Sequence, residues 1–365
     1  MHERFFRVAT VVLILLVAAL LGQPYLDRLL FAATSPRPVV ARSDLPESER
    51  ATISLFERVS PSVVQVVGAA AGASAADMEG EGVREQSGTG VVWDGAGHIV
   101  TNNHVVSGTD QVAVRLASGE VVAASIVGVA PNYDLAVVRL HDTRHLPAPI
   151  AVGTSADLKV GQAAFAIGNP FGLDQSLTTG VISALKRRLP TSGGREIGNV
   201  VQTDAAVNPG NSGGPLLDSA GRLIGVTTAI ISPSGSNAGI GFAIPVDTVN
   251  RVVPELISKG RVPTPGIGIV AANEAVATRL GIEGVVVVRA LPGLPAAEAG
   301  LHGIDQAGQL GDVIVSANGQ PTRRLSDLTD QLEVVGVGRE IELSVKRRDR
   351  LSTVRVKVED VGRSS

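Results

Sequence analysis

A serine in a glycine-rich turn is the feature of this sequence that could most directly carry out chemistry. Ser212 lies within DAAVNPGNSGGPLLD, residues 204–218, where the turn passes into a short apolar run. A turn this rich in Gly and Asn carries the backbone where larger side chains would obstruct it. A serine hydroxyl becomes an effective nucleophile when a base takes its proton and a carboxylate orients that base. The stretch therefore predicts either a simple reversal of the chain or a presented nucleophile.

Histidines and aspartates elsewhere in the chain could supply the base and the carboxylate. Four of the six histidines lie ahead of the N-terminal apolar run, in a polar loop or in the C-terminal part: His2, His141, His145 and His302. The other two, His98 and His104, flank a strand end in HIVTNNHVV, and the polar Thr-Asn-Asn before His104 favours a ring displayed at a loop. In PNYDLAVVRL, Asp134 begins an apolar strand, where a lone Asp is more often a cap. Together, in the order His, Asp, Ser, these residues indicate a nucleophilic hydrolase more strongly than each does alone.

Short strands are the elements that must position these residues. Composition favours strands and turns over long helices, with 42 Gly, 20 Pro, 44% hydrophobic and only 3% aromatic residues in a chain of 365. Valine- and isoleucine-rich segments punctuated by Gly, Asp and Asn run from about residue 51 to 245, which indicates an antiparallel barrel or sandwich. PVDTVNRVVPELISKG then has helical periodicity with a stop at Gly260, and RVPTP is a domain boundary.

Charge and cysteine content exclude several classes of function. The net charge is −3 without a basic block, so nucleic acid is not an expected partner. The chain has no cysteine, which excludes disulfides and a thiol nucleophile.

The N-terminus predicts a membrane segment. Arg4 and Arg7 precede an apolar run from Val8 to Leu21. We expect an uncleaved anchor over 8–22, with a cleaved signal peptide as the alternative, and both place the rest of the chain across the membrane from its basic end. The polar, proline-containing residues 23–50 are interpreted as a tether behind a cytoplasmic segment 1–7.

The motifs TNNHVV, DLAVVRL and QTDAAVNPGNSGGPLLD resemble those of trypsin-like serine proteases of the HtrA/Deg family, in particular the membrane-tethered, DegS-like members and the chloroplast Deg-like members. The resemblance covers residues 51–360. It implies a mainly β fold, with a chymotrypsin-like double β-barrel of two six-stranded barrels over 51–258, a linker over 259–264 and one PDZ domain over 265–360. It also implies a serine endopeptidase without cofactor or metal, with His104 as general base, Asp134 as its orienting carboxylate and Ser212 as nucleophile.

The resemblance also explains the turn and suggests a substrate pocket. The N–H groups of Gly210 and Ser212 would form an oxyanion hole, and Gly213 and Gly214 would leave space for substrate. Digestive relatives carry Asp where Asn211 stands and pair it with a freed amino terminus, so activity here would depend on ordering of the loop 207–211. An uncharged pocket for small or medium apolar side chains would be lined by Ala206, Thr227, Thr228, Ala229, Gly239, Ile240, Gly241 and Phe242, with the substrate added as a strand along 225–230.

The C-terminal unit resembles a PDZ domain through PTPGIGIV, the helix LSDLTDQLEVV and the hairpin turn at Asn318-Gly319. N–H groups of Ile267, Gly268 and Ile269 would hold the carboxylate of a peptide with an apolar C-terminus. The segment HGIDQAGQ is an insertion relative to shorter family members and leaves its loop geometry open.

Two polar segments have plainer interpretations. Residues 68–88 are interpreted as a surface loop. KRRLPTSGGREIG, residues 186–198, is either a solvated loop or the regulatory loop of HtrA-type proteases, with Arg187 and Arg188 as its candidates.

The resulting hypothesis is an ATP-independent endopeptidase of the cell envelope, on the periplasmic side of the inner membrane and single-pass. It would cleave regulatory or misfolded proteins in quality control or stress response and be regulated through its PDZ domain. The resemblance further implies a homotrimer. The alternative is a catalytically silent PDZ-containing chaperone or binding protein.

Overall fold

A computed structural model of the chain describes residues 2–31, 36, 39–40, 44–69, 86–169, 175–190, 196–230, 239–279, 281–306, 308–348 and 350–363. It divides into two compact units, Met1–Arg50 and Ala51–Ser365. The segment 68–88, expected as a surface loop, lies mostly outside the described residues.

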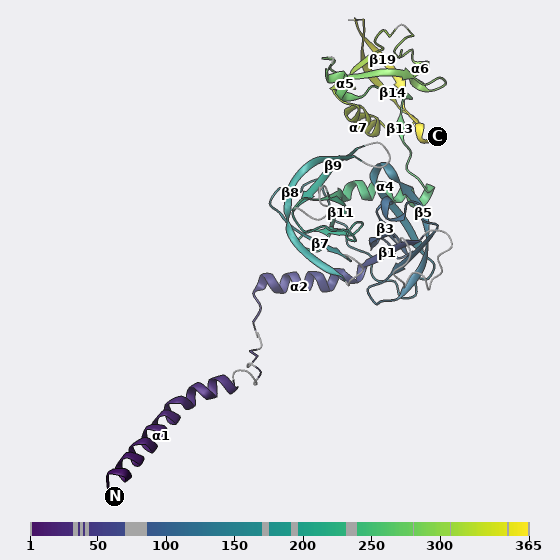
Figure 1. Cartoon of the computed structure of the whole chain (residues 1–365). Helices are drawn as coiled ribbons and strands as arrows, with labels where there is room; N and C mark the ends of the chain where they lie inside the picture. The colour runs from purple at the N-terminus through teal and green to yellow at the C-terminus, as the bar shows by residue number, and fades with distance from the viewer. Residues whose placement is uncertain are drawn as a thin grey trace. The chain divides into compact units, whose positions relative to one another are not determined.

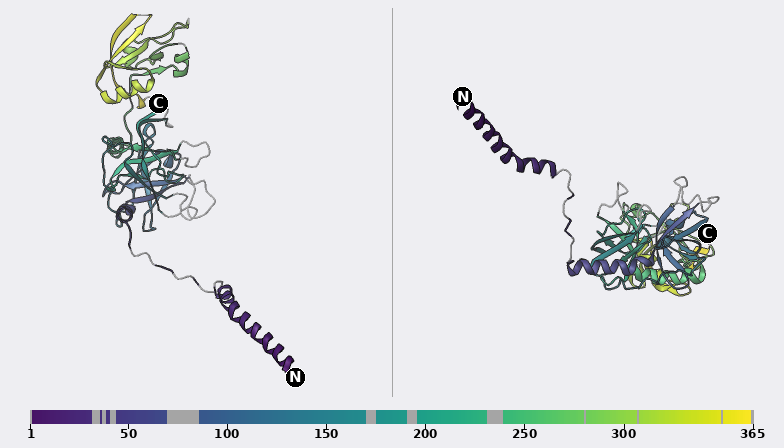
Figure 2. Two further views of the ribbon diagram at one scale, coloured as in Figure 1. Left: turned by 90° about the vertical axis from the view of Figure 1, so that its left-hand side faces the viewer. Right: turned by 90° about the horizontal axis from the view of Figure 1, so that it is seen from below.

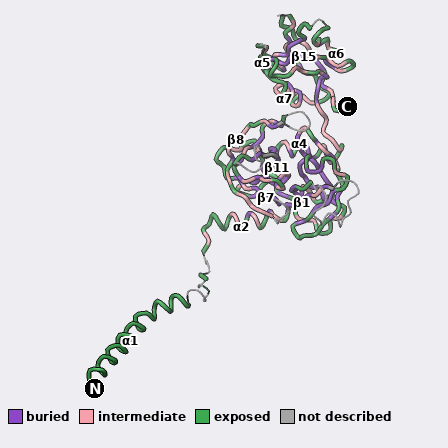
Figure 3. The backbone as a smooth tube through the Cα atoms, in the orientation of Figure 1, coloured by how far each residue is buried: buried purple, intermediate pink, exposed green. Residues whose placement is uncertain are grey.

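The first unit is dominated by helix α1, His2–Phe31, which is exposed along its described length (Figure 3). By length and composition this helix could cross a membrane. The apolar segment was predicted to end near residue 22, but the helix continues through Pro24, and Leu26, Leu29 and Leu30 extend its apolar surface. Helix α2, Glu47–Val59, also begins within the predicted tether, and its Leu55 and Val59 are buried. The expectation of a tether over all of 23–50 therefore underestimated its helical content.

Six strands close the first barrel of the second unit, in the order β1-β2-β3-β6-β5-β4 (Figure 1). They are β1 Val63–Ala69, β2 Gln86–Val92, β3 His98–Thr101, β4 Gln111–Arg115, β5 Val121–Ala130 and β6 Leu135–Leu140. Val64, Val66, Val112 and Val114 follow the period of two expected of strands and fill this barrel. Helix α3, Asn103–Val106, and the 3-10 turn η3, Pro131–Tyr133, follow β3 and β5.

The second barrel also has six strands, in the order β10-β11-β12-β9-β8-β7, and it is seen apart from the first in the right-hand view of Figure 2. They are β7 Ala163–Gly168, β8 Ser176–Pro190, β9 Glu196–Thr203, β10 Pro215–Leu217, β11 Leu223–Ile230 and β12 Gly241–Pro245. The two predicted six-stranded barrels are thus confirmed. Strands β9 and β10 had not been predicted, because β9 has few apolar residues and β10 is short.

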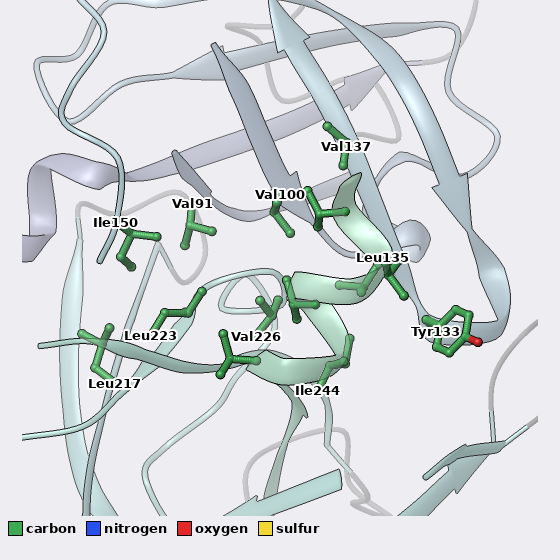
Figure 4. Close-up of a cluster of buried hydrophobic side chains, with 14 of the residues drawn as sticks. Val91, Val100, Tyr133, Leu135, Val137, Ile150, Leu217, Leu223, Val226 and Ile244 are labelled. Carbon is green, nitrogen blue, oxygen red and sulfur yellow. The ribbon is translucent and has the colours of Figure 1, made fainter. Parts of the chain in front are cut away.

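A shared hydrophobic core holds the two barrels together. Side chains from the first barrel, such as Val91, Val100 and Leu135, meet Leu223, Val226 and Ile244 of the second (Figure 4). Helix α4, Val246–Lys259, adds its buried valines and Leu256 to the same cluster. Its end at Gly260, which adopts the left-handed conformation and donates its N–H to the Leu256 carbonyl, agrees with the predicted stop.

The C-terminal domain has its own core of buried hydrophobic residues, which include Ile267, Leu328 and Leu332. Its elements are β13 Pro265–Gly266, β14 Ile269–Ala271, α5 Glu274–Arg279, β15 Val285–Ala290, α6 Pro295–Glu298, β16 Val313–Ala317, β17 Gln320–Pro321, α7 Leu325–Val335, β18 Glu340–Arg347, β19 Arg350–Lys357, β20 Glu359–Asp360 and η5 Val361–Arg363. Strand β14 is the first in the order β14-β15-β16-β18-β19, so among the described strands it pairs on one edge only, with β15. Asn318 and Gly319 both have positive φ between β16 and β17, as a tight hairpin turn requires.

The inserted segment 302–309 is closed by an ion pair whose carboxylate is buried and whose arginine is partly exposed. The fully buried carboxylate of Asp312 accepts hydrogen bonds from the N–H of His302, at 2.8 Å, and from Arg347 at 2.6 and 2.7 Å. Burial alone would raise the pKa of Asp312, but these donors outweigh burial and the pKa is lowered.

Candidate active site

His104 and Asp134 form a hydrogen-bonded pair at one end of the first barrel. His104 lies on α3, and its Nδ1 is 2.8 Å and 3.0 Å from the two carboxylate oxygens of Asp134. The backbone N–H of His104 also donates to Asp134 Oδ1, at 3.1 Å. Because an ionised carboxylate only accepts, Nδ1 carries the proton and Nε2 is left as an acceptor. The His104 side chain is 47% exposed, so a substrate can approach the ring.

Asp134 is buried and held from several directions. It adopts a left-handed conformation, φ 50°, at the end of η3, immediately before β6. Its carbonyl accepts from Asn102 Nδ2 at 2.8 Å, and its Oδ2 accepts from the Thr228 hydroxyl at 2.5 Å. Thr228 had been expected only in the substrate pocket. Thr228 lies on β11 of the other barrel, and no local pattern in the sequence indicates that it would bond Asp134.

Ser212 projects from the turn between β9 and β10. Its Oγ donates to the Thr228 carbonyl at 2.8 Å, and no hydrogen bond joins it to His104 within the part of the chain that the structure describes. Catalytic hydrogen bonds are often incomplete before substrate binds.

The turn before Ser212 has the shape expected for an oxyanion hole. Asn211 N–H donates to the Asn208 carbonyl at 2.9 Å, and Gly210 has φ 97°, so residues 208–211 form a type II turn. Among the described residues, the N–H groups of Gly210 and Ser212 donate to no acceptor. They are therefore available to an anionic oxygen.

The structure requires glycine at positions 213 and 214 for a different reason from the one predicted. A Cβ at Gly213, where φ is 88°, would collide with the Thr89 carbonyl of β2, and one at Gly214 would collide with the Ile167 carbonyl. These glycines therefore permit close approach of the turn to neighbouring strands. The expectation that they leave space for substrate is corrected.

Asn211, the residue that replaces Asp of the digestive enzymes, is buried. Its Nδ2 lies 3.3 Å from the Ala206 carbonyl, while its Oδ1 has no hydrogen-bond partner among the described residues. Among the described residues, the buried neutral amide thus forms one long hydrogen bond and no ion pair.

The predicted pocket residues do not share one environment. Phe242 is only 5% exposed and belongs to the core between the barrels, whereas Ile240 is 38% exposed. The Thr227 hydroxyl bonds the Asn211 and Gly214 carbonyls, so it faces the nucleophile turn. Ala206 offers its carbonyl to Asn211 and to Thr178, and a Cβ at Gly241 would meet Val207. Gly239 and the backbone of Ala229 lie on either side of residues 231–238, which are outside the description.

The predicted carboxylate loop of the C-terminal domain is formed by Ile267 and Gly268 ahead of β14, which begins at Ile269. Gly268 has φ 78°, and a Cβ there would collide with Leu294. The carbonyls of Ile267 and Gly268 accept from Ala296 and Leu291, while their N–H groups donate to no acceptor among the described residues. This leaves two adjacent donors beside the free edge of β14.

The basic residues of the predicted regulatory loop lie on strand β8, which continues to Pro190. Arg187 Nε donates to Gln202 Oε1 at 3.0 Å within the barrel. Arg188 instead reaches helix α7 of the C-terminal domain, with 2.6 Å to Asp330 and 3.6 Å to Asp327. The two arginines therefore have different partners.

The remaining histidines of the barrels serve local contacts. His98 pairs with Asp94 at 2.7 Å, His141 with the Ser125 hydroxyl at 2.6 Å and His145 with Glu120 at 3.0 Å. Within the described ranges no group of three or more His, Asp and Glu side chains is arranged to hold a metal ion.

Comparisons with known proteins agree with this architecture. The trypsin-like peptidase domain family matches residues 88–226, and the PDZ domain family matches residues 265–358. Protease Do-like 1 of Arabidopsis thaliana chloroplasts is 47% identical over 320 residues, covering 86% of this chain and 73% of that protein. The periplasmic serine endoprotease DegP of Salmonella typhimurium is 38% identical over 283 residues, covering 76% of this chain and 58% of that protein.

Solved structures give the same result. An HtrA-type protease, AlgW with a decapeptide, superposes with a TM-score of 0.68 at 32% identity, covering 84% of this chain and 98% of that one. The serine endoprotease from Yersinia pestis superposes with a TM-score of 0.66 at 32% identity, covering 87% and 100%. With two six-stranded barrels, a serine turn in the second barrel and one PDZ domain, the chain belongs to the HtrA/Deg family of trypsin-like serine endopeptidases.

Proposed function

We propose that Ser212, His104 and Asp134 form the catalytic triad of this endopeptidase. His104 Nε2 takes the Ser212 proton as Oγ bonds to the scissile carbonyl carbon, and the carbonyl electrons move to oxygen. The N–H groups of Gly210 and Ser212 bind that oxyanion. The C–N bond then breaks as the intermediate collapses, and His104 gives the proton to the leaving amine. Water, deprotonated by His104, releases the acyl group and restores Ser212.

The observation that carries this proposal is the His104–Asp134 pair, whose hydrogen bonds leave Nε2 as the free acceptor of the ring. In the full chain, Ser212→Ala should abolish cleavage of an unfolded protein and labelling by a fluorophosphonate. A matched control is Ser62→Ala, because the Ser62 hydroxyl also donates to a backbone carbonyl, at 2.7 Å, but lies outside the site. Cleavage that persists in Ser212→Ala would refute the assignment, and an unlabelled parent chain would favour the chaperone alternative.

We further propose that substrates are regulatory or misfolded proteins of the cell envelope. The supporting features are helix α1, which is long and apolar enough to anchor the chain, and the uncharged residues around Ile240. If α1 is an uncleaved anchor, the chain should remain in membranes after a carbonate wash with its N-terminal residues retained. Recovery of a soluble form that starts near Thr34 would identify a signal peptide instead. The homotrimer stays a prediction that analytical ultracentrifugation can test.

We propose that a peptide C-terminus bound to the PDZ domain regulates the protease through α7. Asp327, Asp330 and Glu333 are spaced by three residues and lie on one face of this helix. Arg188 contacts the first two, and Glu333 accepts a hydrogen bond of 2.9 Å from the Tyr133 hydroxyl. This acidic face of α7 thus contacts the protease domain next to Asp134.

Tyr133 connects this contact to the core. Its ring lies at the edge of the shared hydrophobic cluster with the hydroxyl turned away (Figure 4), and Arg251 stands 5.2 Å from the ring centroid. Burial and then the Glu333 charge raise the pKa of Tyr133, so the hydroxyl remains a donor at neutral pH.

Peptides that end in an apolar residue with a free carboxylate should raise the cleavage rate of the full chain, and their C-terminal amides should not. Couplings of about 1–3 kcal/mol are typical of such links, which corresponds to about 5- to 150-fold. Equal stimulation by acids and amides would refute the carboxylate mechanism, and full activity without peptide would refute PDZ gating.

A further inference from the structure

Two buried threonines, one from each barrel, hold consecutive carbonyl groups of the nucleophile turn. The Thr89 hydroxyl of β2 donates to the Gly210 carbonyl at 2.6 Å. The Thr227 hydroxyl of β11 donates to the next carbonyl, that of Asn211, also at 2.6 Å. Both threonines are at most 1% exposed. Neither hydroxyl can contact substrate, so any effect on catalysis must pass through the turn.

Peptide planarity converts these two bonds into the orientation of the oxyanion donors. In a trans peptide, the carbonyl and the following N–H point in opposite directions. Fixing the Asn211 carbonyl on Thr227 therefore fixes the direction of the Ser212 N–H. Fixing the Gly210 carbonyl on Thr89 directs the Asn211 N–H to the Asn208 carbonyl, 2.9 Å away, and so maintains the turn that presents the Gly210 N–H.

The Thr89 hydroxyl both donates and accepts a hydrogen bond, which restricts where its hydrogen can point. Its oxygen accepts the Asn169 N–H at 3.1 Å, so its own hydrogen must point elsewhere and finds the Gly210 carbonyl. The backbone of Thr89 is fixed as well, because its N–H donates to the Ser212 carbonyl at 2.8 Å and its carbonyl accepts from Thr101 at 2.7 Å. The β-branched side chain has few χ1 rotamers. Strand β2 thus presents the hydroxyl to the turn in one orientation.

This restraint matters because the turn itself is soft. Gly210 has φ 97°, a conformation that glycine leaves at little cost, and the buried Asn211 side chain makes a single long hydrogen bond, at 3.3 Å, among the described residues. We propose that Thr89 and Thr227 are positioning residues of the oxyanion hole, which clamp the nucleophile turn from both barrels. This inference rests on the proposed function of Ser212 and its turn.

The test replaces each hydroxyl by a methyl group in the full chain. Thr89→Val and Thr227→Val should each lower kcat about 10- to 100-fold with KM within two-fold, since loss of a direct oxyanion donor costs about 100- to 1000-fold. Binding of a peptide aldehyde, whose adduct places an oxyanion in the hole, should weaken by the same factor as kcat. Thr89→Ser and Thr227→Ser should restore most of the activity.

The matched control is Thr203→Val. Thr203 is equally buried, donates to the Val181 carbonyl at 2.8 Å and accepts the Ala205 N–H at 3.1 Å, but it does not bond the turn. It should lose thermal stability comparably and keep kcat within two-fold. Should a valine variant fail to fold, Thr89→Ala and Thr227→Ala provide the same comparison.

Variants of Thr89 and Thr227 that keep kcat within two-fold would refute the clamp, as would an equal kcat loss in Thr203→Val. Failure of the proposed function itself would look different, because Ser212→Ala would then retain the activity of the parent chain.

Discussion

The two halves of the proposed active site differ in which barrel supplies the hydrogen bonds that hold them. The base half, His104 and Asp134, lies within one barrel and is already hydrogen bonded in the absence of substrate. The nucleophile half belongs to the second barrel, and its Ser212 hydroxyl bonds the Thr228 carbonyl. Its turn is held by Thr89 from the first barrel and Thr227 from its own. The base is therefore preorganised locally, while the nucleophile and oxyanion hole depend on contacts between distant segments.

This difference indicates where regulation can act. The His104–Asp134 pair forms within one barrel and takes one further hydrogen bond, from Thr228, whereas a turn built on glycines is open to ordering by other elements. Because Thr228 bonds both halves, through its hydroxyl to Asp134 and through its carbonyl to Ser212, it is the residue at which they meet.

The largest expected effect tests the base half. Asp134→Asn keeps the shape of the side chain but can stabilise the wrong tautomer of His104, so kcat should fall about 10⁴-fold. Steady-state kinetics of peptide cleavage measures this loss. Asp94→Asn is the control, because it alters the same kind of contact, at His98, without lowering kcat. Comparable losses in the two variants would mean that the effect is one of stability.

The second prediction tests the residue that joins the halves. Thr228→Val removes the donor to the Asp134 carboxylate and should lower kcat about 10-fold, the typical value of a hydrogen bond to a charged group. Thr228→Ser should restore it, since serine retains the hydroxyl. An unchanged kcat in Thr228→Val, measured with peptide substrate, would show that the base half is complete within its own barrel.

The third prediction addresses ordering through α7. Arg188→Gln removes the contacts with Asp330 and Asp327. Stimulation of cleavage by a carboxylate-terminated peptide should therefore weaken at least about 5-fold, while activity without peptide persists. Arg187→Gln is the control, because Arg187 bonds Gln202 and not α7. Identical peptide titrations of both variants and the parent would exclude Arg188 from the coupling.

The smallest effect on the site is expected in the PDZ domain. The lowered pKa of Asp312 means that its charged form is stabilised by folding, so this stability is present above the carboxyl's ordinary pKa of about 4 and is lost as pH falls through the lower, folded value. Asp312→Asn should lower the unfolding temperature of the PDZ domain at pH 7. Between pH 7 and pH 3 this temperature should then fall less in the variant than in the parent protein. Activity without peptide should not change.

Thermal unfolding monitored at both pH values provides this measurement. Asp142→Asn is the control, because its Arg144 partner is 81% exposed and such surface pairs contribute little. If the unfolding temperature falls equally between pH 7 and pH 3 in the parent protein and in Asp312→Asn, Asp312 does not stabilise the PDZ domain through its charge.

The elements of the fold could be predicted wherever the local pattern was strong. The helix ending at Gly260, the hairpin at Asn318-Gly319 and the helix 325–335 all follow from periodicity and turn chemistry, and the structure contains them. Strands β9 and β10 were missed, since pairing with neighbours makes them strands despite weak patterns. The polar, proline-containing residues 23–50 were predicted as a tether, but helix α1 continues through Pro24 to Phe31.

The sequence by itself determined the kinds of group at the site, because His104, Asp134 and Ser212 lie in motifs whose chemistry depends on neighbours along the chain. Only the tertiary structure decided the direction of each side chain. Both Thr227 and Thr228 had been expected to line a substrate pocket, but the Thr227 hydroxyl bonds the nucleophile turn and the Thr228 hydroxyl bonds Asp134. Position 213 requires glycine because a Cβ there would collide with the Thr89 carbonyl. A hydrogen bond between barrels joins residues far apart in the chain, and no local spacing records which partner folding will bring.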